Sequence, residues 1–331
     1  MSGTKPAVPE LLPSVLDIDP EALIAEIVDS LQEAVRIRLR KRGAVVALSG
    51  GIDSSVVLAL CARAFGPDGV LGLLMPERES ADDTAELARL AAGTLGVPTV
   101  EEDITSALEA VGCYRLRDDA FRELIPEYAA GWKAKIVLPP ILGGQSFRLF
   151  SVVARSPQGE EIRVRVSADA YRRIVAATNF KQRTRKMLEY YHADRLEYAV
   201  TGTPNRLEYD LGFFVKNGDG AADVKPIAEL YKTQVYELAA SLGIPEEIRR
   251  RTPTTDTYPL AQDQEEFYFS LPYRGMDLAL YARTNGYPPE SLAAAIEVST
   301  DDATRLYADI DAKRRIAETL NLPALVAKRP S

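Results

Sequence analysis

The hydrophobic pattern divides the first hundred residues into alternating strands and helices. Short apolar runs at residues 44–48, 69–75 and 99–104 predict three strands, the first of them buried on both faces. Apolar residues at helical spacing, each set followed by a glycine, predict helices over residues 55–65 and 81–95. This β-α-β-α-β order predicts an α/β fold: a parallel, doubly wound sheet with helices on both faces.

The rest of the chain is mainly helical, with one interruption. Residues 112–169 begin with a charged helical segment and continue with two β-rich runs that flank the hairpin signal Ser156-Pro157-Gln158-Gly159. We therefore expect a single domain over residues 19–331 with a β-hairpin insertion at about 112–169, after a Pro-rich, mobile arm over residues 1–18. The other expected elements are a strand over residues 197–203 and helices over residues 19–42, 171–195, 230–242 and 278 onward, with breaks near Gly286 and Ser299.

The loop between the first strand and the next helix has the clearest chemistry. It reads Ser49-Gly50-Gly51-Ile52-Asp53-Ser54, and Ser55 follows. Glycines let backbone N–H groups approach an anion, serine hydroxyls can donate to it, and a helix N-terminus favours negative charge. The loop has neither the Gly-Lys-Ser/Thr of a Walker A loop nor the G-x-G-x-x-G of a dinucleotide site. Because Asp53 is itself an anion, a phosphate here implies a divalent metal that bridges the two.

Composition excludes several classes of function. A net charge of −8 over 331 residues argues against broad nucleic-acid binding. No apolar run is long enough to span a membrane and no signal peptide is recognisable, so we expect a cytoplasmic enzyme without a membrane partner. Two cysteines and one histidine are too few for a Cys-rich or His-clustered metal site. We expect Cys61 in the core and His192 on a helix surface.

Six motifs, in their order along the chain, resemble those of ammonia-dependent NAD synthetases, a family of ATP pyrophosphatases. The Ser-Gly-Gly-x-Asp-Ser loop is followed by Asn179/Arg183/Arg185, Gly202-Thr203 with Glu208, Phe214-Val215-Lys216-Asn217-Gly218-Asp219-Gly220, Lys232, and Pro253-Thr254-Thr255-Asp256. The resemblance covers roughly residues 20–105 and 170–275. It implies an adenine nucleotide alpha-hydrolase-like fold.

The resemblance also implies a reaction and the residues that carry it out. ATP activates a substrate carboxylate as an acyl-adenylate with loss of pyrophosphate, and ammonia then displaces AMP. In the family the acid is nicotinic acid adenine dinucleotide (deamido-NAD). The residues implied for ATP are Ser49, Gly50, Gly51, Asp53, Ser54, Ser55, Thr203, Lys232 and Thr254, of which Asp53, Lys232 and Thr254 are the catalytic ones. Those implied for Mg²⁺ are Asp53 and Glu208, and those for the acid substrate are Asn179, Arg183, Lys216 and Asp219.

Family members work as homodimers with the acid site at the subunit interface, so a homodimer is expected. No glutaminase domain is present in these 331 residues. Ammonia is therefore expected to be free or delivered by a separate protein.

Three departures from the family pattern leave the identity of the acid open, one of them being that the only basic pair at the C-terminus is Lys328-Arg329. The segment between Ile104 and Asn179 is longer than the compact pattern requires, and the residues after Asp256 match it only in part. The alternative is an ammonia-dependent amide synthase of the same fold that acts on a different carboxylic acid. An enzyme acting on tRNA is disfavoured by the acidic charge and the lack of paired CxxC motifs. A regulatory module without catalysis is disfavoured because Asp53 and Glu208 are both present.

Overall fold

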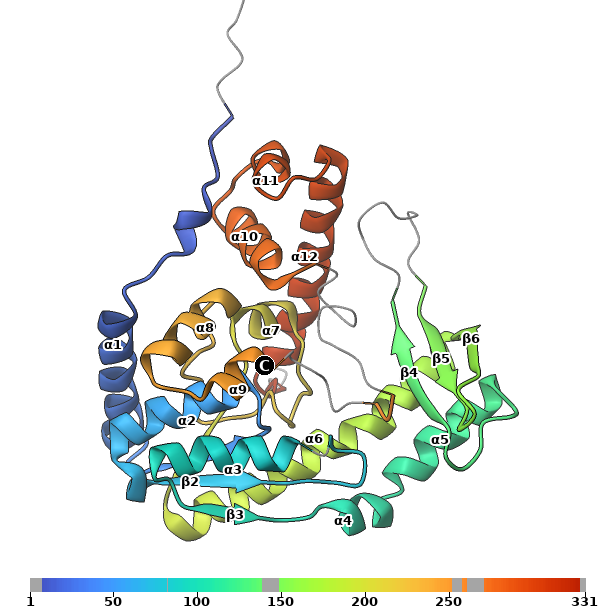
Figure 1. Ribbon diagram of the computed structural model, residues 1–331, viewed down its shortest axis with the longest axis horizontal. Coiled ribbons are helices and arrows are strands. Elements are labelled where there is room, and N and C mark those ends of the chain that lie inside the picture. Colours follow the sequence, from blue (N-terminus) through green and yellow to red (C-terminus); the bar gives the residue numbers. More distant parts are fainter. Residues whose placement is uncertain (1–7, 82, 139–148, 252–257, 261–270, 328–331) are drawn as a thin grey trace, which may run out of the picture.

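A four-stranded parallel sheet organises the computed structural model, which describes residues 8–81, 83–138, 149–251, 258–260 and 271–327 (Figure 1). The strands lie in the order β3-β2-β1-β7, and β1 pairs with β2 from Ala44–Val70 to Leu48–Leu74. This arrangement confirms the predicted parallel sheet. The strands are β1 (Ala44–Leu48), β2 (Val70–Leu74), β3 (Thr99–Glu101) and β7 (Ala199–Thr201).

Helices cover both faces of this sheet. Successive residues of a strand point to opposite faces, so a strand that is apolar throughout needs a helical layer on each side. Val46 and Leu48 of β1 join one hydrophobic cluster, and Val45 joins another on the opposite face. All five residues of β2 are buried, as expected for a strand between two helical layers. The first cluster contains residues of α1 (Pro20–Gln32), α2 (Ile52–Phe65), α3 (Thr84–Leu95) and α8 (Lys232–Ser241). The second contains residues of α4 (Thr105–Ala110), α5 (Cys113–Leu124) and α6 (Ala168–Leu196).

Several predicted boundaries are wrong by a few residues. The helix expected over residues 19–42 is α1 followed by one wider turn, η2 (Glu33–Arg38), and the positive φ of 55° at Arg40 prevents its continuation. The helix α2 begins at Ile52 rather than Ser55, because Gly51 is its extended N-cap residue. Short elements that the pattern did not predict include α4, η3 (Pro67–Gly69), α7 (Arg206–Leu211) and α9 (Glu246–Arg250).

The insertion contains one strand more than the sequence predicts. The predicted hairpin is present as β5 (Ser151–Arg155) and β6 (Glu161–Arg165), and β4 (Lys133–Val137) pairs antiparallel with the other edge of β5. Ile136 of β4 is buried in a separate cluster with Phe121 of α5 and residues of α6. The sheet therefore packs on α5 and the N-terminal half of α6, on the right in Figure 1.

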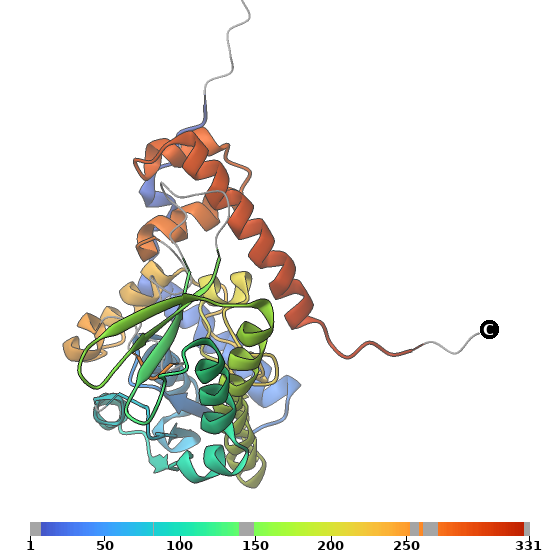
Figure 2. The ribbon, with the colours of Figure 1, turned by 90° about the vertical axis from the view of Figure 1, so that its right-hand side faces the viewer.

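Three helices, α10 (Tyr273–Thr284), α11 (Pro289–Ala295) and α12 (Thr300–Asn321), form a C-terminal unit whose breaks match those predicted. Figure 2 shows α12 as a long helix along the side of the molecule. Leu11 and Leu16 are only 4% and 5% exposed and pack into this unit, and Leu16 is the last residue of the short helix η1 (Pro13–Leu16). The described part of the expected mobile arm is therefore anchored, because its two leucines bury apolar surface. Within the described ranges, no helix has the length and apolar character needed to cross a bilayer.

Candidate active site

The segment Ser49–Ser54 runs from the carboxyl end of β1 into the first turn of α2. Gly50 has a φ of 66°, in the left-handed region. A Cβ at this position would lie 2.5 Å from the carbonyl oxygen of Thr84, so the close packing of the loop on α3 requires glycine. The free N–H groups of the first turn of α2 are thus held at the carboxyl edge of the sheet, where parallel α/β folds bind their ligands.

The three serines of the loop have different environments. Ser49 is exposed, and its Oγ lies 3.2 Å from that of Ser54. Ser54 donates to the carbonyl of Gly51 at 3.0 Å, and Ser55 donates to the same carbonyl at 2.9 Å. Ser55 is only 1% exposed. Its hydroxyl therefore stabilises the first turn of α2, whereas the sequence predicted that this hydroxyl would donate to a phosphate.

Asp53 lies between two elements from the second half of the chain. Its Oδ2 is paired with Nζ of Lys232, and its Oδ1 accepts a hydrogen bond from Nδ2 of Asn205 at 3.0 Å. The Lys232 side chain is 0% exposed. The structure thus brings together two of the three predicted catalytic residues, Asp53 and Lys232, whereas Thr254 lies outside the described residues.

Glu208 is a second carboxylate on the same side of the sheet, in the first turn of α7. It forms a capping box with Asn205: the Glu208 N–H donates to Oδ1 of Asn205 at 3.3 Å, and the Asn205 N–H donates to Oε2 of Glu208 at 3.1 Å. Burial, and next the negative charge of Asp53, raises the pKa of Glu208 to about 8. Asn205 therefore touches both predicted metal ligands, although the sequence pattern did not single it out.

Lys232 is held at both of its ends by α10. Its Nζ lies 5.3 Å from the ring centroid of Tyr273, and its backbone N–H donates to Oδ1 of Asp277 at 3.2 Å. Figure 1 shows α7 and α8 between the sheet and the C-terminal helices. Sequence reasoning missed Asp277. The sequence feature that could have indicated it is an acid within the otherwise apolar run Met-Asp-Leu-Ala-Leu, because an acid in such a run is expected to be buried with hydrogen-bond partners.

The residues predicted for the acid substrate lie on α6 and on the loop after α7. Arg183 is exposed, and its Nε donates to the carbonyl of Lys216 at 3.3 Å, so these two residues are neighbours. Asn179 is half-buried one turn earlier on α6. The N–H of Val215 donates to Asp219 at 2.7 Å, and burial raises the pKa of Asp219.

Thr203, predicted to line the ATP side, is half-buried just after β7. It therefore lies at the same carboxyl edge of the sheet as the loop after β1, because β1 and β7 are adjacent and parallel.

A buried ion cluster fixes the loop after β2, at the same carboxyl edge. Lys181 of α6 is 1% exposed and lies 2.8 Å from both Oε1 of Glu77 and Oε2 of Glu79. Arg117 of α5 binds both oxygens of Glu79, at 2.6 and 2.8 Å. Tyr114 donates to Glu77 at 2.6 Å. The cationic pattern of α6 is thus partly structural, since Lys181 stabilises this loop.

Histidine and cysteine have no part in this site. His192 is 3% exposed, so the prediction of a surface position is wrong. Its Nε2 lies 3.0 Å from Glu102 and its Nδ1 faces Arg195, and these polar partners compensate for its burial on α6. Cys61 is 0% exposed, as predicted.

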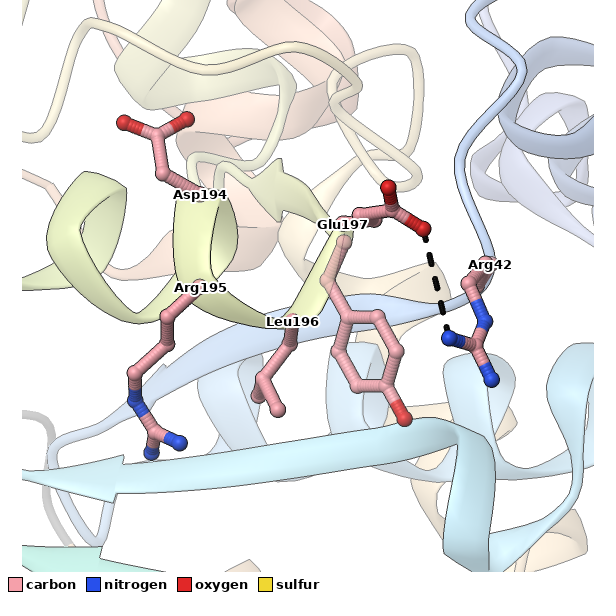
Figure 3. Close-up of a pocket in the computed structure, with 6 residues that line it drawn as sticks. Arg42, Asp194, Arg195, Leu196 and Glu197 are labelled. Atoms are coloured by element: carbon pink, nitrogen blue, oxygen red, sulfur yellow. Dashed lines mark ion pairs between the residues drawn. The ribbon is translucent and has the colours of Figure 1, made fainter.

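The surface hollow in Figure 3 lies at the amino ends of β1 and β7, opposite the loop at Ser49. It is lined by Arg42 and by the end of α6, and Arg42 forms an exposed ion pair with Glu197 at 3.9 Å. Ligands of parallel sheets bind at the other edge, so this hollow is not the active site.

The sequence of the whole chain decides the family. A family model described as NAD synthase matches residues 23–126 and 160–317, which is more than half of the chain. The chain belongs to the NAD synthase family. The part that the family model leaves unmatched between its two segments, residues 127–159, contains β4 and β5 of the insertion.

Curated relatives from this family match the chain along most of its length. The NH3-dependent NAD+ synthetase of Mesorhizobium japonicum is 54% identical over 313 residues, covering 95% of this chain and 98% of the relative. That of Rhizobium meliloti is 55% identical over 312 residues, covering 94% and 93%. A protein of this length, insertion included, is thus found among relatives that have this name.

Solved structures share the fold. The NMN synthetase of Francisella tularensis has a TM-score of 0.65 at 21% identity, covering 95% of this chain and 100% of the other. The NH3-dependent NAD synthetase of Campylobacter jejuni, in complex with the nitrate ion, has a TM-score of 0.61 at 21% identity, covering 94% and 100%. These likenesses support the adenine nucleotide alpha-hydrolase-like fold predicted from the sequence.

Proposed function

We propose that the protein is an ammonia-dependent NAD+ synthetase, a ligase that forms a C–N bond. The observation that supports this most directly is the pair of Asp53 and Lys232 at the phosphate loop of a chain from the NAD synthase family. A carboxylate oxygen of deamido-NAD attacks the α-phosphorus of ATP, and the bond to the leaving pyrophosphate breaks. Ammonia then attacks the carbonyl carbon, loses a proton, and AMP leaves as the C–O bond breaks.

On the ATP side, the chain's own residues bind and orient the phosphates. The N–H groups of the first turn of α2, preceded by Gly50 and Gly51, receive phosphate oxygens, and the exposed Ser49 donates to them. Lys232, with Thr254, stabilises the charge that develops on the departing pyrophosphate. Ser54, Ser55 and Thr203 shape the site around them. The reaction needs no protein nucleophile, so catalysis consists of positioning and charge stabilisation.

Asp53 and Glu208 fit Mg²⁺, and these two carboxylates would hold the ion when ATP is bound. The charge of Asp53 raises the pKa of Glu208, so the two carboxylates are close enough to repel each other, and a divalent cation between them would relieve this repulsion. Among the residues that the structure describes, no group of three or more His, Cys, Asp or Glu would hold a metal unaided. This suits Mg²⁺, which is usually held by one or two carboxylates together with phosphate oxygens. When bound, Mg²⁺ neutralises phosphate charge.

On the acid side, Arg183 and Lys216 provide positive charge for the anionic dinucleotide, with Asn179 and Asp219 beside them. Arg183 is exposed, and its guanidinium group can bind a phosphate or a carboxylate through two parallel hydrogen bonds. Asp219 accepts from the backbone of its own loop and so keeps Lys216 and Val215 in place.

The relatives also bear on the identity of the acid. Rhizobial proteins more than 50% identical over nearly the whole chain are named NH3-dependent NAD+ synthetases, so the insertion does not favour another carboxylic acid. Ammonia is taken up free or from a separate protein. The protein works as a cytoplasmic homodimer.

Incubation of the purified protein with ATP, Mg²⁺, ammonium and deamido-NAD tests the proposal. NAD, AMP and pyrophosphate should appear in equal amounts, and omission of Mg²⁺ or ammonium should stop NAD formation. Asp53→Asn is the matched inactive control. If the protein binds ATP but forms neither NAD nor AMP, the proposed activity is wrong.

A further inference from the structure

Asp277 is a fully buried carboxylate that faces the first turn of another helix. It lies on α10, is 0% exposed, and accepts three hydrogen bonds from the start of α8. The Lys232 N–H donates to Oδ1 at 3.2 Å, and the N–H and hydroxyl of Thr233 both donate to Oδ2 at 2.8 Å. Asp277 thus acts as an N-cap supplied from 44 to 45 residues further along the chain.

Burial of a carboxylate is costly unless donors surround it. Burial raises the pKa of Asp277 to about 6, and the donors at Thr233 and Lys232 limit that rise. A helix N-terminus can instead be capped by its own Ser, Thr, Asn or Asp at much lower cost. The residue before α8 is Tyr231, and its N–H is bonded to the side chain of Gln234. The distant acid therefore fixes α8 against α10, which a local cap does not do.

The residue that this contact fixes is Lys232. Its backbone N–H binds Asp277, while its ammonium is paired with Asp53 and lies 5.3 Å from the ring centroid of Tyr273. Tyr273 and Asp277 are four residues apart on α10, so they lie on the same face of that helix. One turn of α10 therefore contacts both the backbone and the head group of Lys232.

We propose that Asp277 is a positioning residue for Lys232: through the first turn of α8, it aims the ammonium at Asp53 and at the phosphates. The proposal rests on the role of Lys232 in the proposed function. The C-terminal unit is then part of the active-site scaffold, although it contributes no group to the phosphate loop itself.

Steady-state kinetics of Asp277→Asn, which keeps the size of the side chain, test this role. We expect kcat to fall about tenfold, because Lys232 is displaced where charge develops. The KM for deamido-NAD should stay within about twofold. The matched control is Asp311→Asn, which removes an acid paired with Arg283 of the same unit at 2.7 Å and should leave kcat unchanged. If Asp277→Asn fails to fold, Thr233→Val removes one of the three donors and should lower kcat about threefold.

A double-mutant cycle separates positioning from general destabilisation. In a Lys232→Met background, Asp277→Asn should change the rate of AMP formation by less than about twofold, because the residue on which it acts is gone. An equal loss in both backgrounds would overturn the proposal.

Amide hydrogen exchange gives a readout without turnover. In the ligand-free protein, Asp277→Asn should speed exchange at the amides of Lys232 and Thr233, whereas Asp311→Asn should not. Unchanged exchange at those two amides would also overturn the proposal. If the wild-type protein forms no NAD, the proposed function fails, while the exchange data still decide whether Asp277 holds α8.

Discussion

The ammonium of Lys232 is paired with the carboxylate of Asp53, and the two residues are 179 positions apart in the chain. Burial alone would lower the pKa of Lys232, but Asp53 and Glu208 raise it, so the lysine is charged. This pair joins the first turn of α2 to the start of α8. Loss of this pair is therefore expected to affect both the free energy of unfolding and the proposed reaction.

Asp53→Asn is expected to reduce AMP formation at least about 100-fold, because it removes charge from the position of the metal and the phosphates. It should also lower the free energy of unfolding by about 2–4 kcal/mol, since Lys232 is left buried without its main partner. Turnover assays and denaturant unfolding at pH 7 measure the two effects. The control Asp68→Asn, at an exposed acid, should change neither. Near wild-type turnover in Asp53→Asn would refute the assignment.

Glu79→Gln is expected to destabilise the protein in a pH-dependent way. Burial by itself raises the pKa of Glu79, but hydrogen bonds and charges from Arg117 and Lys181 lower it to about 2. Because the folded pKa is below the unfolded one, the stabilisation is complete above about pH 4.5 and is lost as the pH falls toward 2. The variant should lose about 3 kcal/mol at pH 7, and this loss should shrink as the pH falls through that range.

A control for this experiment is Glu101→Gln, whose carboxylate pairs with Arg89 on the surface. It should cost less than about 1 kcal/mol at pH 7. A loss for Glu79→Gln that does not change between pH 7 and pH 3 would contradict the role of the ion cluster.

Gly50→Ala is expected to disrupt the phosphate loop, because its new Cβ would lie 2.5 Å from the carbonyl oxygen of Thr84. Gly96→Ala provides a matched control, since Gly96 has a φ of 67° but no atom within 4 Å of an added Cβ. The control should lose only about 1 kcal/mol of stability, the cost of left-handed backbone. Gly50→Ala should lose more stability than the control. Titration calorimetry should also show that it binds ATP more weakly than the wild-type protein. Equal losses in the two variants would show that the approach to α3 is unimportant.

Arg183→Ala is expected to raise the KM for deamido-NAD about tenfold or more, while the KM for ATP stays within about twofold. The exposed guanidinium lies beside Lys216, another residue predicted to face the acid substrate. Arg172→Ala, at an exposed arginine of the same helix that pairs with Asp169, is the control and should change neither constant. Equal effects on both substrates would count against the division of the site into two halves.

The sequence predicts the elements whose signals are local. The apolar runs that became β1 and β2, the glycine stops and the breaks in the C-terminal helices were read from neighbouring residues alone. β4 was missed, because five residues that include two lysines have a weak pattern until they pair with β5. The surface position predicted for His192 was wrong, because its burial depends on Glu102, which is 90 positions away.

The sequence by itself determined the glycine- and serine-containing loop between β1 and α2, which it predicts to bind phosphate, and, through the order of its motifs, the family. A loop of this kind needs particular residues at adjacent positions, so its chemistry is visible in the chain. Only the tertiary structure decided that Ser55 faces Gly51, that Asn205 bridges Asp53 and Glu208, and that Asp277 holds Lys232. The contacts of Asn205 with Asp53 and of Asp277 with Lys232 join residues on different elements. The contact of Ser55 turns its side chain back onto the backbone of Gly51 at the start of its own helix. Packing in three dimensions decides both kinds of contact.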